Sequence, residues 1–287
     1  MLQALVISGI ANGSIYAVVA LGLTLVYRST RVLNFAHGEV VMLGAYLGYT
    51  FYRILALPYA VTAIATVVCG FALGLVLERV ARRPLASGSL ISVMLATVGI
   101  GFALKGVALV LWLDDYLTFP PIYGMAPLSV GRLFLTAQDV ILIGTSLTLM
   151  LVFFALFRLT SLGKRLRASA SNRLGAALVG IRVERMFASA WGLACVLGVM
   201  AGLLIAPISL VYPDMGFDVF VKSFAGAVLG GFGSFTGAVV GSLLVGMIEH
   251  LAGGYISTVL VGAAPFVIIA GVLLIFPRGL FGGVRES

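Results

Sequence analysis

The residues best suited to chemistry in this chain are Asn34, His37 and Glu39, which stand inside the otherwise apolar run NFAHGEVVMLGAYLG at 34–48. Polar and ionisable side chains are costly in a lipid bilayer and commonly mark function there. The break at 36–39 separates two apolar segments, which is the pattern of a discontinuous helix at a transporter site. A short cytoplasmic turn between two spanning helices is the competing interpretation, and spacing alone leaves both open.

Three roles are open to this polar set, to which we add Gly38. It could line a pathway, brace a broken helix, or lie at a cytoplasmic gate. Bracing is the preferred role, because backbone groups freed at a helix break must find partners in lipid. His37 and Glu39 are two residues apart and would not face each other on one helix. Nothing in the sequence supplies the further ligands that a metal site needs.

The elements that position these residues are membrane helices. The chain is 61% hydrophobic and 10% charged, with a mean hydropathy of +1.17. Apolar runs near 20 residues indicate a polytopic helical membrane protein, and their length argues against a barrel. The chain has a net charge of +8, and its basic residues lie in short loops at helix ends. This is the positive-inside pattern, so nucleic acid is not expected as a partner.

The sequence predicts an all-α fold with about eight hydrophobic segments in one transmembrane domain at 1–287. No P-loop motif occurs in it. The first segment has basic residues after it rather than before it, so we expect it to remain as a spanning helix with the N-terminus outside. The expected segments are 5–27, 34–52, 59–77, 90–113, 140–157, 187–211, 224–246 and 258–276.

A glycine cluster is expected to interrupt the segment at 224–246. Its members are Gly230, Gly231 and Gly233. One full crossing over 225–249 would bring Arg278 outside, so two pieces that enter and leave on the same side satisfy the charge rule better. Two interrupted segments in corresponding halves indicate inverted repeats.

Small residues of the same region are expected to pack helices. Gly233, Gly237 and Gly241 are spaced four apart and share one helix face, and Gly226 and Gly230 repeat this spacing upstream. The neighbour could belong to this chain or to a partner.

Lys105 stands inside another apolar run. Its stem could snorkel toward an interface. Alternatively it could pair with Glu249 or Glu78, or contribute to a pathway.

The loop at 158–186 is the longest polar stretch. It holds seven basic residues against one acid, Glu184, which makes it cytoplasmic by the charge rule. Helix-forming residues around 167–178 indicate a short helix within it.

Several motifs together resemble one family, the LivH-type permease subunits of branched-chain amino acid ABC importers. They read NFAHGEVVMLGAY at 34–46, ERVARRPL at 78–85, AVLGGFGSFTGAVVGSLLVGMIE at 227–249 and FPRGLFG at 276–282. The resemblance covers nearly the whole chain. It implies a second, LivM-type permease, two ABC ATPase subunits, and a periplasmic or extracellular substrate-binding protein. It also implies a bacterial inner membrane, and ATP and magnesium bound by the ATPases, with no cofactor in this chain.

The resemblance makes the 158–186 loop the element that couples the permease to its ATPases. Residues that match the family pattern of small residues followed by glycine are Arg167, Ala168, Asn172, Ala176, Ala177 and Gly180. The acid of the wider importer motif is absent, and either Asn172 or Gly175 stands near its place. Arg167 and Arg173 could pair with acids on the ATPase. The alternative is a basic loop that only orients the protein.

The function expected from these features is transport without catalysis. ATP hydrolysis on partner subunits would drive alternating access for branched-chain or related amino acids. An ion-coupled secondary transporter is the first alternative, with Glu39, Glu78 or Glu249 as the ion-carrying acid. An importer permease for urea or amides is the second. A membrane enzyme is not favoured, since the sequence offers no convergent catalytic cluster.

Overall fold

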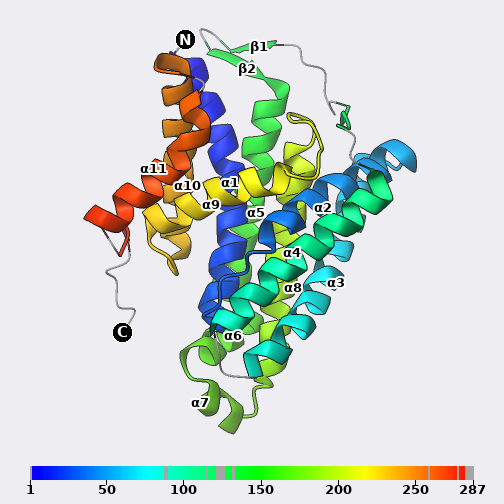
Figure 1. Cartoon of the computed structure of the whole chain (residues 1–287), viewed down its shortest axis with the longest axis vertical. Helices are drawn as coiled ribbons and strands as arrows, with labels where there is room; N and C mark the ends of the chain where they lie inside the picture. Colours follow the sequence, from blue (N-terminus) through cyan, green and yellow to red (C-terminus); the bar gives the residue numbers. More distant parts are fainter. Residues whose placement is uncertain are drawn as a thin grey trace.

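The structure is a computed structural model that describes residues 2–86, 90–113, 116–120, 127–130, 133–257, 259–276 and 278–281. Within these ranges the regular secondary structure is helical apart from one short hairpin and one isolated bridge between Leu117 and Val211. Figure 1 shows a tall bundle with the N-terminus at one end.

The first half holds α1 (Leu2–Thr30), α2 (His37–Tyr49), a π-helical turn (Thr50–Ile54), α3 (Tyr59–Ala86) and α4 (Leu90–Trp112). An antiparallel hairpin of β1 (Pro127–Val130) and β2 (Leu133–Thr136) leads into α5 (Ala137–Leu159). Two short helices follow, α6 (Ser161–Ser171) and α7 (Arg173–Leu178). The second half holds α8 (Val183–Ile205), α9 (Met215–Gly230), α10 (Phe235–Tyr255) and α11 (Val259–Ile275).

Six of the described helices are long and apolar enough to cross a membrane: α1, α3, α4, α5, α8 and α10. The shorter apolar helices α2, α9 and α11 complete the bundle. The prediction of an all-α polytopic membrane protein is confirmed. In the described residues, the glycine cluster separates α9 from α10.

The two halves form an inverted repeat, as predicted. α1 packs along α10 as α8 packs along α3, and α2 packs on α8 as α9 packs on α1. The outer helices repeat this, since α4 contacts α2 and α3 as α11 contacts α9 and α10. In Figure 1, α1 descends from the N-terminus while α8 ascends beside it, so corresponding helices run in opposite directions.

The first helix break lies earlier than expected. Residues 31–36 are not helical, so Gly38 and Glu39 belong to the first turn of α2 rather than to the break. The side-chain oxygen of Asn34 accepts a hydrogen bond from the Ala36 N–H at 3.1 Å. This Asx-type turn competes with helical bonding and holds the backbone out of the helix until His37.

The second break lies where the glycine cluster predicted it. α9 ends at Gly230, and Gly231 and Gly233 have φ of 102° and 105°, which glycine adopts without strain. The last carbonyls of α9 accept hydrogen bonds from the C-terminal segment: Leu280 N–H to Leu229 at 2.9 Å and Phe281 N–H to Gly230 at 3.0 Å. This segment therefore closes the end of α9.

Glycines let α9 and α10 touch through their backbones. A Cβ at Gly241 would overlap the Gly226 carbonyl, and one at Gly237 would overlap the Gly230 carbonyl. The neighbour of this face is thus a helix of the same chain, as small residues at helix contacts permit. Gly233 does not share the face, since it lies in the turn before α10 begins.

Candidate functional site

The two short helices meet at their N-termini. Gly38 and Gly216 are the second residues of α2 and α9. A Cβ on Gly38 would lie 2.8 Å from the Gly216 carbonyl oxygen, and one on Gly216 would overlap the Gly38 carbonyl. The first turns therefore touch backbone to backbone. Each helix N-terminus carries a partial positive charge, so the two ends create a region that favours anionic groups.

Three charged side chains gather at this point. Lys105 of α4 donates a hydrogen bond to the carboxylate of Asp214, which precedes α9. Glu39, in the first turn of α2, is attracted by Lys105 and repelled by Asp214. We call Gly38, Glu39, Lys105, Asp214 and Gly216 the charged crossing.

The charged crossing is partly open. The Asp214 side chain is 70% exposed and that of Lys105 is 26% exposed. In contrast, the Glu39 Oε2 atom is buried and has no hydrogen-bond partner. The crossing therefore combines one cation, two acids and two helix N-termini, a set that can bind both ends of a zwitterion.

The expected partners of Lys105 were wrong. Lys105 pairs with Asp214 rather than with Glu249 or Glu78. The two paired residues are 109 positions apart, and only the packing of the inverted repeat brings them together.

Asn34 and His37 lie inside the bundle rather than at the charged crossing. Asn34 is 2% exposed and His37 is fully buried. The His37 ring lies between α1 and α8, where a Cβ at Gly22 would come 2.7 Å from Nε2 and one at Gly198 would come 3.3 Å from Cε1. The polar set predicted from the sequence is thus divided, with Glu39 alone at the crossing.

Thr97 of α4 also supports the first break, and no sequence pattern indicated this role. Its hydroxyl oxygen accepts a hydrogen bond from the Phe35 N–H at 3.2 Å. A backbone donor that the helix leaves free is satisfied in this way, as a lipid environment requires.

A second charged cluster links α1, α9 and α10. Lys222 Nζ lies 2.6 Å from Glu249 Oε1, and the Tyr16 hydroxyl donates to Glu249 Oε2 at 3.0 Å. Beside it, Asn12 Nδ2 lies 3.0 Å from His250 Nε2. The Glu249 side chain is 4% exposed and that of Lys222 is 21% exposed, so the acid is buried and the lysine is partly buried. A lysine within the apolar stretch around 219–225 was the available signal for this cluster.

The predicted loop element consists of α6 and α7, which lie at the end of the molecule away from the N-terminus (Figure 1). Asn172 joins them: its N–H donates to the Ala168 carbonyl at 3.0 Å, and its side-chain oxygen accepts from the Gly175 N–H at 2.9 Å. Gly180, at φ 84°, follows α7. Within α7, Ala176 is buried, whereas Ala177 is exposed.

Arg167 and Arg173 anchor this element to the bundle. Arg167 donates to the Phe157 carbonyl and lies 5.4 Å from the centre of the Phe157 ring. Arg173 lies 4.7 Å from the centre of the Phe187 ring and donates to the Thr30 carbonyl at 3.5 Å. Their guanidinium groups therefore already have contacts within the chain.

Sequence reasoning missed the apolar surface of α7. Leu174, Leu178 and Val179 are 73%, 80% and 76% exposed. We call these three residues the α7 patch. They lie outside the helices that could span a membrane, and large exposed apolar side chains of this kind mark protein interaction sites. The leucine spacing of four was the available signal.

Two broken helices in an inverted repeat, with a charged site where they cross, define a transport protein of the membrane. The chain belongs to the family described as "Branched-chain amino acid transport system / permease component", whose model matches residues 5–277.

Curated relatives agree with this family. The chain is 31% identical over 289 residues to the high-affinity branched-chain amino acid transport system permease protein LivH of Escherichia coli K12, covering 96% of this chain and 94% of that protein. It is 28% identical to BraD of Pseudomonas aeruginosa, with the same coverage. A probable LivH of Methanocaldococcus jannaschii is 28% identical over 95% of this chain and 90% of that protein. No solved structure matches the chain significantly.

Proposed function

We propose that this permease moves branched-chain or related amino acids as one subunit of a binding-protein-dependent ABC importer. The observation that carries the proposal is the α7 patch, an apolar surface on a helix beyond the membrane spans. Such a surface fits the groove of a partner ATPase, and the basic loop around it marks the cytoplasmic side.

The charged crossing suits an amino acid. The two helix N-termini and Lys105 would receive the substrate carboxylate, as broken helices do in other transporters. Asp214 and the unpartnered oxygen of Glu39 would receive the ammonium group. A neutral urea or amide has no charged ends to pair with Lys105, Asp214 and Glu39, which favours the amino acid.

Apolar surface lies next to these charges. Phe217, in the first turn of α9, is 55% exposed, and Phe35, just before α2, is 37% exposed. Exposed rings beside a site for both charged ends match a ligand with an aliphatic side chain.

The remaining parts of the proposal follow from the family and the charge rule. Residues 1–287 form one permease domain, and the 158–186 loop couples it to two ATPase subunits that bind ATP and magnesium. A second permease of the LivM type completes the pathway, and a soluble binding protein delivers substrate. The N-terminus lies outside and the C-terminus inside the cytoplasmic membrane. In this proposal Asn34 and His37 brace the first helix break.

An ion-coupled transporter is the competing function. It needs an intramembrane acid that is free to bind an ion. Glu249 is paired with Lys222 and Tyr16, which disfavours it in that role.

Affinity purification of the tagged chain from its native membrane, with mass spectrometry of the bound proteins, tests the proposal. Two ATPases and a second permease are expected. The recovered complex is then placed in vesicles with its binding protein, and amino-acid uptake is measured with ATP or with an ion gradient. Uptake that requires the ion gradient and does not depend on ATP would overturn the proposal.

A further inference from the structure

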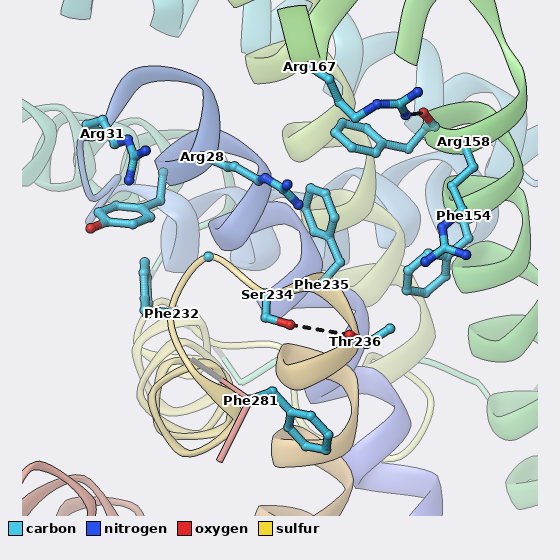
Figure 2. A pocket seen from close by; sticks show the side chains of 13 residues that line it. Arg28, Arg31, Phe154, Arg158, Arg167, Phe232, Ser234, Phe235, Thr236 and Phe281 are labelled. Atoms are coloured by element: carbon cyan, nitrogen blue, oxygen red, sulfur yellow. Dashed lines mark hydrogen bonds between the residues drawn. The ribbon is translucent and has the colours of Figure 1, made fainter. Parts of the chain in front are cut away.

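A basic cavity lies at the same end of the molecule as α6. Its volume is about 750 Å³, and it is lined by the ends of α1 and α5, by α6, and by the turn between α9 and α10. Four arginines line it, and none of its lining residues is acidic. They are Arg28, Arg31, Arg158 and Arg167. Figure 2 shows them around the turn that carries Ser234 and Thr236.

Two of the arginines form part of the wall. Arg167 donates to the Phe157 carbonyl, and the guanidinium of Arg28 lies 5.1 Å from the centre of the Phe235 ring. The other two, Arg31 and Arg158, are exposed, and neither has an acidic partner in the part of the chain that the structure describes. These two cations are available to an anion from outside the chain.

The α9–α10 turn adds further positive charge. α10 is 21 residues long and begins at this cavity, with Ser234 as its N-cap. The N-terminus of a helix of this length favours phosphate, and arginine binds phosphate oxygens in a forked geometry. The chemistry of the cavity is therefore that of a phosphate site.

The position of Arg158 indicates where the phosphate comes from. Leu147 and Leu151 of α5 are 50% and 60% exposed. Arg158 is seven residues after Leu151, so it continues the same helix face. An acyl chain along these leucines would bring its headgroup to Arg158. Basic pockets between membrane helices on the cytoplasmic side bind anionic lipid headgroups in this manner.

We propose that this cavity binds the phosphodiester headgroup of an anionic membrane phospholipid, with an acyl chain along the exposed face of α5. The bound lipid would join α1, α5 and α6 to the α9–α10 turn. This inference goes beyond the proposed transport function. It is tested by direct binding, so it can fail while the transport function stands.

The test is a titration of the purified full chain with phosphatidylglycerol and with phosphatidylcholine of the same acyl chains, read by native mass spectrometry. The unchanged chain is expected to prefer phosphatidylglycerol. Equal binding of the two lipids would overturn the proposal without any variant.

A pair of double variants locates the site. Each arginine near the membrane surface contributes about fivefold to the affinity for an anionic lipid. The double variant Arg31→Gln with Arg158→Gln is therefore expected to weaken phosphatidylglycerol binding by roughly 30-fold. Arg165→Gln with Arg185→Gln removes the same charge from exposed positions outside the cavity lining, and should change binding less than threefold. Equal losses in the two double variants would place the effect in overall charge and refute the site.

Two competition arms identify the occupant. Glycerol 3-phosphate should not displace the lipid, because it lacks the acyl chain, and full displacement at equal concentration would indicate a site for free phosphate. Adding the partner ATPases should leave the lipid bound. Release of the lipid would show that an acidic protein surface occupies the cavity, and would overturn the proposal.

Discussion

Truncation of the α7 patch should separate docking from folding. In the double variant Leu174→Ala with Leu178→Ala, both side chains are lost from a surface that is 73% and 80% exposed in the free chain. Little internal packing is removed, and alanine is a better helix former than leucine. The free energy of unfolding should therefore change by no more than about 0.5 kcal/mol.

The expected loss in binding follows from the exposed area. Complete burial of a leucine side chain contributes roughly 1.5–3 kcal/mol. About three quarters of each side chain is available for burial, and alanine retains one carbon, so each truncation should remove on the order of 1.5 kcal/mol. Together they should remove about 3 kcal/mol, which corresponds to a Kd raised by roughly 100-fold.

The assay is biolayer interferometry of the purified ATPase subunits against the permease complex in nanodiscs. The matched control is Leu95→Ala with Leu111→Ala, since these leucines of α4 are 66% and 63% exposed on a helix that could span the membrane. This control should bind the ATPases normally. If the α7 variant is as stable as the unchanged chain and its Kd changes less than threefold, α7 is not the docking helix.

Three other perturbations test the interior. Glu249→Gln leaves the Lys222 cation unpaired in a largely buried place and should cost about 3 kcal/mol of stability, measured as a lower Tm in detergent. Adding Lys222→Met should recover most of this loss, and an unchanged Tm in the single variant would contradict the ion pair. Gly44→Ala places a Cβ into the backbone of α8 and should lower the free energy of unfolding by about 1–3 kcal/mol. In the control Gly99→Ala, the new Cβ meets nothing within 4 Å, so the Tm should be unchanged or higher, and equal Tm values for the two variants would contradict the close contact. Lys105→Met should lower the maximal rate of amino-acid uptake by at least about tenfold, because a charge-assisted hydrogen bond is lost, while the Tm is retained. Normal uptake would show that Lys105 is not part of the pathway.

The features that the sequence could predict are local or compositional. Hydropathy identified the class because the cost of exposing polar groups to lipid acts on every residue of a spanning helix. The second break was predictable because Gly231 and Gly233 adopt a backbone conformation that other residues avoid. The first break was misplaced by a few residues, since its cause is one side-chain hydrogen bond of Asn34.

The features that the sequence could not predict depend on which helices become neighbours. Lys105 was assigned the wrong partner. The pattern of one sequence does not indicate that α4 lies beside Asp214, the residue that precedes α9. The spacing of His37 and Glu39 indicated that the two would not face each other on one helix, but it did not indicate their surroundings. His37 is fully buried, and Glu39 lies near Lys105. The pairing of Arg167 and Arg173 with acids on an ATPase stays a prediction, whereas their contacts with rings of their own chain were not predicted.

In the proposed function, these contacts would link α6 mechanically to the charged crossing. Arg167 covers the Phe157 ring, whose centre lies 4.7 Å from that of Phe235, the first residue of α10. The tight turn before Phe235 joins α9, which spans about 24 Å from that turn to the crossing. The Lys222–Glu249 pair fastens α9 to α10, so the two helices should move as one body. A displacement of α6 would then tilt the N-terminus of α9 against that of α2, which changes the site without requiring either helix to unfold.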